Sequence, residues 1–198
     1  MDMTKKTKSE DLFEKFLDEN CISYERIKVA GQGRSMDYLL IINGYEVAFE
    51  IKEISKDENF KADLSSRTVG AHIRAKISKG KKQIQSVARN GVPAVLLIYN
   101  NLDPMHLFGT ENHDFMAAMH GELTVRISKR SNKIIDMFHG HNKSFSKGKN
   151  TSFSAVGRLR PCQGRLEVTL FDNPWARVKL DYAKLPDCFE IQYVYIDN

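Results

Sequence analysis

The dipeptide Asn43-Gly44, set between two apolar runs, constrains the fold of this chain more than any other feature of its sequence. The run before it spans residues 38–42 (YLLII), and the run after it spans residues 45–52 (YEVAFEIK). Asn-Gly between two such runs is the strongest short-range signal for a β-hairpin, because both residues tolerate the positive φ angles of a two-residue turn. The sequence therefore predicts two antiparallel strands over 38–42 and 45–52.

The segments on either side of this hairpin predict both helices and strands. Ser9 precedes apolar residues at helical spacing, which favours an N-capped amphipathic helix, and residues 92–99 (VPAVLLIY) are typical of a buried strand. Gly80 lies within a second segment of helical spacing, which it can break or bend. The expected elements are a helix over 9–20, a strand over 22–29, a helix over 69–89 and a strand over 92–99. Their order predicts an α/β fold with a mixed central sheet flanked by helices.

The second half of the chain has a different pattern, with short apolar runs separated by Gly, Asn and Pro. It predicts one short helix over 112–120 and no longer one. The expected strands cover residues 123–127, 152–159, 166–171 and 189–196. We therefore expect a core over 1–100 and a β-rich C-terminal extension over 101–198 that packs on it.

Composition limits the class of protein. The chain has 198 residues, of which 41% are hydrophobic, and this is enough apolar material for a core. No apolar run approaches the roughly 18–20 residues of a membrane span, so we expect no membrane association. The three cysteines are few and widely spaced, and no apolar stretch follows the charged start. Both features favour a protein of the cytoplasm with reduced thiols.

The net charge of +5 is unevenly distributed along the chain. Residues 61–90 contain eight basic residues and one acid, and residues 126–165 contain ten basic residues and one acid. The two blocks carry +7 and +9, so the rest of the chain carries −11. Lys and Arg neutralise phosphates and release counterions, so two basic blocks indicate a polyanionic partner. The alternative is two solvated faces without a ligand.

Three residues of the predicted hairpin form a candidate catalytic site. Side chains at i and i+2 of a strand project together, so Glu50 and Lys52 share one face, and the partner strand brings Asp37 toward them. Two carboxylates and the backbone carbonyl between Glu50 and Lys52 are the oxygen ligands that Mg²⁺ or Mn²⁺ accepts. Such a metal can polarise a phosphodiester and activate water, and the Lys52 ammonium can orient that water or stabilise negative charge. An edge strand with an ordinary ion pair is the alternative.

This pattern resembles the PD-(D/E)XK nuclease superfamily, which has the restriction-endonuclease-like fold. The resemblance covers residues 9–99: a helix with an acid, a strand that begins at Asp37, a hairpin, the triplet Glu50-Ile51-Lys52, a basic helix and an apolar strand. Met36 stands where the family name has proline. Within the superfamily, the early helix and the segment 31–37 are most similar to archaeal Holliday-junction resolvases, from which the long β-rich extension departs.

The resemblance implies further site residues. Asp37 and Glu50 would hold the metal, Lys52 would be catalytic, and Glu10 would be a supporting acid, with Glu14 as its alternative. Gln83 is similar to a helical Lys/Gln position near the phosphate in some members. The residues expected to contact nucleic acid are Arg34, Lys76, Lys79, Lys81, Lys82, Gln83, Lys147 and Lys149.

We therefore expect a metal-dependent nuclease that hydrolyses phosphodiester bonds. DNA is favoured over RNA because most of the superfamily acts on DNA, and a homodimer would allow both strands to be cut. One alternative is a nucleic-acid-binding protein with the same fold and no catalysis. A module that meets an acidic protein through its basic faces is another.

Overall fold

The hairpin predicted at Asn43-Gly44 forms at the expected place. The computed structural model describes residues 6–27, 36–55, 68–103 and 105–193. Strands β2 (Tyr38–Ile42) and β3 (Tyr45–Ile54) pair antiparallel, with Ile42 opposite Tyr45. Asn43 and Gly44 have φ angles of 50° and 79°, as a two-residue turn requires. The strand prediction is confirmed, and β3 extends two residues beyond its expected end.

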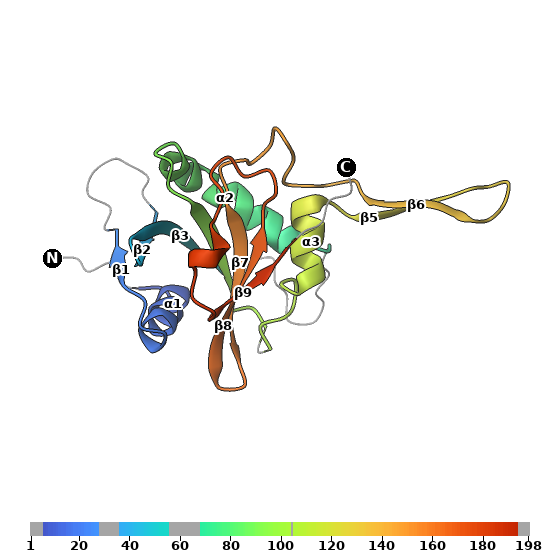
Figure 1. Cartoon of the computed structure of the whole chain (residues 1–198). Helices are drawn as coiled ribbons and strands as arrows, with labels where there is room; N and C mark the ends of the chain where they lie inside the picture. The colour runs from blue at the N-terminus through green and yellow to red at the C-terminus, as the bar shows by residue number, and fades with distance from the viewer. Residues whose placement is uncertain (1–5, 28–35, 56–67, 104, 194–198) are drawn as a thin grey trace.

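Seven strands form one mixed sheet, which confirms the predicted α/β class (Figure 1). Their order across the sheet is β1-β2-β3-β4-β7-β8-β9. The pairs β3–β4, β4–β7 and β8–β9 are parallel, and β1–β2, β2–β3 and β7–β8 are antiparallel. The remaining bounds are β1 Tyr24–Arg26, β4 Ala94–Asn100, β7 Ala155–Cys162, β8 Arg165–Asp172 and β9 Phe189–Gln192, with a short 3₁₀ helix at Tyr182–Lys184.

The strands of the second half continue the same sheet. β7 lies parallel to β4, with Leu97 opposite Gly157, and β8 and β9 follow it. A Cβ atom on Gly157 would come within 2.9 Å of Leu97 Cδ1, so glycine allows β4 and β7 side chains to pack closely. Three strands of the region 101–198, which was expected to pack on the core, lie within the same sheet, and residues 155–159 of β7 are buried as in a central strand.

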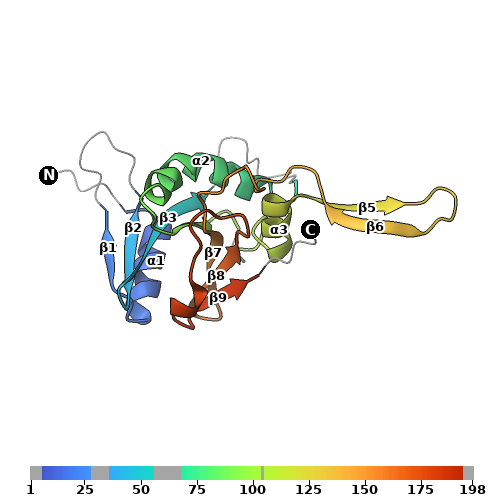
Figure 2. The same ribbon diagram turned by 45° about the horizontal axis from the view of Figure 1, so that its top comes forward.

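The helices cover the two faces of the sheet (Figure 2). Helix α1 (Lys8–Glu19) buries Phe13, Phe16 and Leu17 against one face. Helices α2 (Ala71–Ala88) and α3 (Asn112–His120) pack on the other, with Ile73, Ile77 and Phe115 in their core. All three helices were predicted within a few residues of these bounds. The expected N-cap was wrong: Thr7, not Ser9, caps α1, since its hydroxyl accepts from the Glu10 amide.

Helix α2 passes Gly80 without a break. A Cβ atom at this position would lie 3.2 Å from Leu96 Cδ1 and 3.9 Å from Glu50 Cγ, so glycine lets the helix approach the sheet directly over Glu50. The helix backbone stays regular because tertiary packing offsets the cost of about 1 kcal/mol for glycine relative to alanine. Among the described residues, neither α2 nor any other helix is long and apolar enough to cross a membrane.

An arm of two strands projects from the body beyond α3 (Figures 1 and 2). It consists of β5 (Leu123–Ile127) and β6 (Ile134–His139), which pair antiparallel and form a separate sheet. We call residues 122–140 the β5–β6 arm. The sequence predicted β5 but not β6, because β6 is exposed along its whole length and has no alternation of apolar and polar residues.

Candidate active site

The β2–β3 register brings Asp37 and Glu50 to adjacent positions. Asp37 immediately precedes β2, and its amide donates to Phe49 O at 3.2 Å, which places it opposite the residue after Phe49. Its carboxylate oxygen Oδ2 accepts from the amide of Ile51 at 2.7 Å. The predicted convergence of these two acids is therefore present, and it follows from the two-residue turn that sets the register.

Glu50 and Lys52 share the α2 face of β3, as strand alternation predicts. Glu50 is 1% exposed, and its Oε1 forms an ion pair with Lys52 Nζ. The second oxygen, Oε2, is buried and has no hydrogen-bond partner among the described residues. A buried carboxylate oxygen without a donor is costly unless a cation or a solvent molecule meets it.

Both carboxyl groups are shifted toward their neutral forms. Burial and, to a smaller extent, the nearby Asp37 charge raise the pKa of Glu50 to about 7, against the effect of Lys52. Burial also raises the pKa of Asp37, although its hydrogen bond from Ile51 and the charge of Lys52 oppose the shift. Two desolvated acids side by side lack positive charge, because Lys52 alone does not compensate them. This electrostatic state favours a divalent cation between them.

The donor set fits such a cation. Glu50 Oε2 has no partner among the described residues, and Asp37 uses only Oδ2 in the bond to Ile51, so each acid offers an oxygen. Hard divalent ions such as Mg²⁺ and Mn²⁺ take carboxylate oxygens and complete their shell with water or phosphate. Asp37 and Glu50 are therefore the residues that would hold the metal.

Glu10 lies near the pair but has other partners. Its negative charge lies close enough to raise the pKa values of both Asp37 and Glu50. Its Oε2 accepts from the Thr7 amide at 2.7 Å, and its Oε1 accepts from Arg26 Nη2 at 3.0 Å. Glu10 therefore influences the two acids through its charge and not through a direct hydrogen bond. The alternative, Glu14, accepts from the Tyr38 hydroxyl at 2.9 Å and pairs with Lys6, so it fixes α1 on β2.

The sequence analysis missed two residues near these acids. Arg26 lowers the pKa of Asp37 by its charge while it pairs with Glu10, and it links α1 to the site. Glu53 Oε2 accepts from the Ser9 amide at 3.2 Å, and its Oε1 accepts from Asn101 Nδ2 at 2.9 Å, so it joins α1 to the end of β4. Strand alternation places Glu53 on the face of β3 opposite Lys52, which is the face that α1 covers, so the sequence could have indicated a contact between Glu53 and α1.

The basic residues expected to contact nucleic acid separate into groups. Lys81 and Lys149 line one pocket, although they come from different basic blocks. Lys79, Lys82 and Lys147 are exposed outside it. Lys76 and Gln83 are half-buried on α2, and Arg34 lies outside the described residues.

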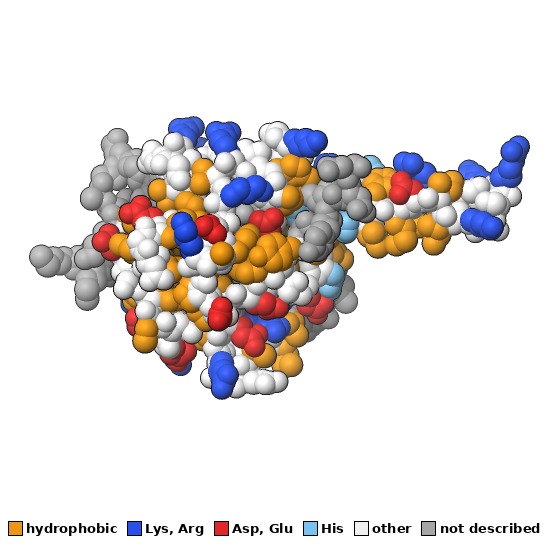
Figure 3. All heavy atoms as spheres, in the orientation of Figure 1, with side chains coloured by type: hydrophobic (Ala, Val, Ile, Leu, Met, Phe, Trp, Pro, Cys, Tyr) orange, Lys and Arg blue, Asp and Glu red, His pale blue; other side chains and the backbone are white. Residues whose placement is uncertain are grey.

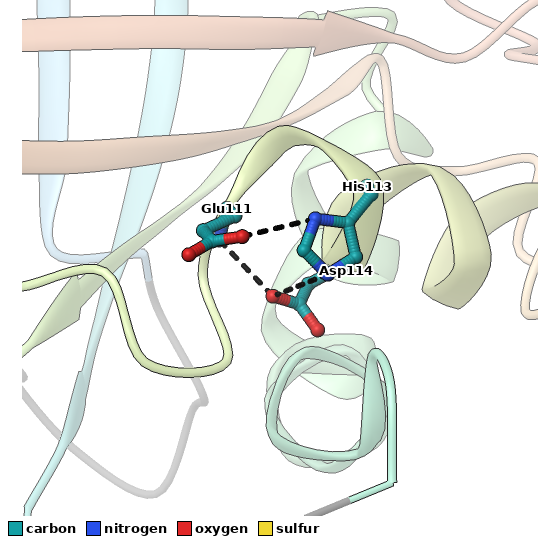
Figure 4. Close-up of side chains that lie close together, drawn as sticks. All are labelled: Glu111, His113 and Asp114. Carbon is teal, nitrogen blue, oxygen red and sulfur yellow. Dashed lines mark hydrogen bonds and ion pairs between the residues drawn. The ribbon is translucent and has the colours of Figure 1, made fainter.

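A second group of possible metal ligands lies at the start of α3 (Figure 4). Side-chain atoms of Glu111, His113 and Asp114 lie within 4.8 Å of one another. Asp114 already accepts from the Gly70 and Glu111 amides, at 3.1 and 3.2 Å, and Glu111 is the N-cap of a capping box. These contacts are those of a helix N-terminus and account for the cluster without a metal.

Comparison of the chain with protein-family models, with curated proteins and with solved structures finds no match in any of the three.

Proposed function

We propose that this chain is a metal-dependent nuclease that hydrolyses phosphodiester bonds, with DNA as the favoured substrate. The observation that carries the proposal is the pair of half-buried Asp37 and buried Glu50, with a raised pKa at both acids and Lys52 beside Glu50. An ordinary edge strand does not explain it, because β3 is central and Glu50 is 1% exposed.

The order of elements supports a place in the PD-(D/E)XK superfamily. An acid-bearing helix (α1), the strand after Asp37 (β2), the E-x-K strand (β3), a basic helix (α2) and an apolar strand (β4) all occur in the order that the resemblance implies. β3 and β4 pair parallel through α2, which is the crossover such an order requires.

Each residue has a defined part in the proposed reaction. Asp37 and Glu50 would hold the cation, and Lys52, half-buried beside Glu50, would orient the attacking water or stabilise negative charge on the phosphate. The ion pair with Glu50 holds the Lys52 ammonium in place. A bound Mg²⁺ would supply Lewis acidity toward the phosphodiester and lower the pKa of its water. Both carboxylate oxygens of Glu10 already accept hydrogen bonds, so Glu10 would add negative charge near the site without binding the metal directly.

A cleavage assay tests the proposal. Supercoiled plasmid, single-stranded DNA, a branched junction and RNA are each incubated with Mg²⁺, with Mn²⁺ and with chelator. Wild type is compared with Asp37→Asn, with Lys52→Ala and with Glu46→Gln, an exposed acid on the same strand that serves as the matched control. We expect metal-dependent cutting by wild type and Glu46→Gln only.

Other outcomes would contradict the proposal. Cutting that persists in Asp37→Asn and Lys52→Ala would place the activity elsewhere. Salt-sensitive binding without cutting would indicate a nucleic-acid-binding protein without catalysis. Binding to no nucleic acid at all would favour the module that meets an acidic protein.

A further inference from the structure

A basic pocket lies between α2 and the loop that follows the β5–β6 arm. Its volume is about 360 Å³, at the lower end of the range for small-ligand sites. It is lined by Arg74, Ile77, Ser78 and Lys81 from α2 and by Asn142, Lys143, Ser144, Lys149 and Asn150 from the loop. The pocket therefore joins the two basic blocks of the sequence, which are far apart in the chain.

The lining has four cations and no carboxylate. Arg74 is fixed by backbone carbonyls, since Nη2 donates to Val69 O at 2.6 Å and Nη1 to Ala117 O at 3.3 Å. Lys149 Nζ donates to Lys143 O at 2.8 Å. No ion pair is found for the four cations among the described residues, so no carboxylate there neutralises their charge, and Arg74 and Lys149 are also held in place by backbone carbonyls. Converging cations that repel one another favour an anion between them.

The pocket lies on one flank of α2, whereas Glu50 lies beneath the helix, on the face that Gly80 presents to the sheet. Gly80 faces Glu50, and each residue of an α-helix is turned by about 100° from the last. Lys81 and Arg74 therefore share the flank that meets the loop, whereas Gln83 is turned to the other flank. A ligand in the pocket would lie beside the candidate active site without entering it.

We propose that this pocket binds a phosphate of the nucleic-acid backbone other than the one that is cleaved. The identity of this ligand rests on the proposed nuclease function, and the four unneutralised cations are independent of it. Charge-assisted hydrogen bonds from a fixed guanidinium and from lysines are the usual means of holding a phosphate. The pocket would fix the position of the substrate along α2, and so select which phosphodiester reaches Asp37 and Glu50.

The test compares two pairs of lysines that carry the same charge. The double variant Lys81→Ala/Lys149→Ala removes two cations from the pocket, and Lys82→Ala/Lys147→Ala removes two exposed cations from the same helix and loop. Binding of labelled duplex and single-stranded DNA is measured by fluorescence anisotropy, with chelator present, over a range of salt concentrations. We expect the pocket variant to bind at least ~10-fold more weakly and its salt slope to fall by about 1, the effect of one lost phosphate contact. In the control variant, the change in the logarithm of the dissociation constant should be less than half of that in the pocket variant.

Equal losses in the two pairs, or no DNA binding by wild type, would overturn the pocket proposal. The outcome is separable from that of the cleavage assay, because chelator removes the metal from the binding measurement. Selective loss of binding in a protein that never cuts would keep the pocket and reject the nuclease. If the wild type cuts DNA but the two double variants bind DNA equally well, the nuclease proposal stands and the pocket proposal is rejected. Melting temperatures within about 2 °C of wild type would show that these exposed substitutions leave the fold intact.

A separate observation concerns the two faces of the β5–β6 arm. Paired residues of an antiparallel ladder share a face, so Val125 and Met137 lie together, and Arg126 and Asp136 lie together on the other face. On the second face, Arg126 stacks over the Phe138 ring at 5.2 Å and lies 3.7 Å from Asp136. Six large apolar side chains of the arm are between 41% and 62% exposed: Leu123, Val125 and Met137 lie on the first face, and Ile127, Ile134 and Ile135 lie where the register of the ladder shifts. Figure 3 shows hydrophobic side chains along the lower side of the arm.

We infer that this apolar face packs against the same face of a second copy of the chain. The tip, residues 128–133, carries three cations and no acid, and the root of the arm begins at Glu122. Two arms related by a two-fold axis and packed antiparallel would place each basic tip beside Glu122 of the other arm. An isolated two-stranded hairpin is marginally stable in water, and packing of two arms would bury its apolar side. A stable dimer buries roughly 800 Å² per partner, which the six exposed apolar side chains of the arm and the residues around them can approach.

Two neighbouring substitutions test this interface. Val125→Asp places a charge on the apolar face, and Thr124→Asp places the same charge on the opposite face. Sedimentation equilibrium should give a dimer for wild type and Thr124→Asp, and a dissociation constant raised at least ~30-fold for Val125→Asp. A monomeric wild type, or equal effects of the two substitutions, would overturn the inference. Loss of DNA binding in Val125→Asp without any change of mass would also overturn it, and would assign the face to nucleic acid.

Discussion

The Asp37 carboxylate accepts a hydrogen bond from the Ile51 backbone amide at 2.7 Å. An acid that immediately precedes β2 is thereby tied to β3 at Ile51, between Glu50 and Lys52. The bond holds the Asp37 side chain in place, and it leaves Oδ1 available for a ligand. In the proposed nuclease, the Asp37 carboxylate would therefore use one oxygen for the fold and the other for the metal.

Substitutions at Asp37 should separate these two roles. Asp37→Asn keeps a carbonyl oxygen that can accept from Ile51, whereas Asp37→Ala leaves that amide without its partner. We expect Asp37→Ala to lower the free energy of unfolding by ~1–3 kcal/mol and Asp37→Asn by less than half of that. Both should reduce metal-dependent cleavage by ~10²-fold or more. Chemical denaturation and single-turnover cleavage measure the two effects. Equal destabilisation by both variants would show that the Ile51 bond is not the cause.

The pKa of Glu50 predicts how stability depends on pH without metal. In the folded state the Glu50 carboxyl has a pKa of about 7, and in the unfolded chain it has its ordinary pKa of 4.5. The protonated acid therefore contributes stability that is fully present below pH 4.5 and is lost as pH rises through 7. The full effect is up to ~3 kcal/mol, since each unit of pKa corresponds to ~1.4 kcal/mol.

Denaturation of wild type and Glu50→Gln across this pH range, with chelator, measures the contribution. His120 is buried, and burial lowers its pKa to about 4, so its contribution is lost as pH falls from 6.5. The difference between wild type and Glu50→Gln cancels this opposite trend. A difference that does not change with pH would exclude a raised pKa at Glu50.

Divalent cations should stabilise the folded protein at the two acids. We expect Mg²⁺ or Mn²⁺ at 100 times its dissociation constant to add ~2.7 kcal/mol to the free energy of unfolding. At a fixed metal concentration, the gain should be larger at pH 8 than at pH 6, because Glu50 must lose its proton to bind a metal and the dissociation constant therefore falls as pH rises. Thermal denaturation with and without metal tests this in wild type, Glu50→Gln and the control Glu46→Gln. An equal gain in all three would place the metal elsewhere.

Gly80 should be intolerant of a branched side chain. A Cβ atom there already comes within 3.2 Å of Leu96 Cδ1, and two more carbon atoms would force α2 away from Glu50. We expect Gly80→Val to cost ~1–3 kcal/mol, typical of an overpacked core, and to reduce cleavage as well. Gly148→Val, at a position with no atom within 4 Å, should change the stability by less than ~0.5 kcal/mol. Wild-type stability of Gly80→Val would mean that α2 can shift at little cost.

The hairpin and the placement of Asp37, Glu50 and Lys52 could be predicted because they depend on local rules. A two-residue turn sets the register, and alternation along a strand sets the face, so residues 37–52 contain the necessary information. The pKa of Glu50 could not be predicted in this way. It depends on burial under α2, and the close approach of that helix requires Gly80, which the sequence analysis treated as a possible break.

The pairing of β7 with β4 and the basic pocket depend on contacts between distant segments. Nothing near Lys81 indicates that the loop containing Lys149 will lie against it. The missed strand β6 has another cause, since Ile134 and Ile135 are adjacent apolar residues and both are exposed. Burial patterns, on which strand prediction depends, are lacking in an arm that has water on both faces within one chain.

The β5–β6 arm leaves and re-enters the body at one point. The Glu122 amide donates to His141 O at 2.9 Å and the Gly140 amide donates to Glu122 O at 3.1 Å, so the two strands are joined at their root. Residues can therefore be added to or removed from the arm in opposed pairs without moving the seven-stranded sheet. In the proposed pair of chains, the length of the arm would set the distance between the two bodies, because each added pair of residues lengthens the arm by about 3.4 Å. The spacing of two cuts in one substrate would then be set by the number of residues between Glu122 and Gly140 rather than by the catalytic residues themselves.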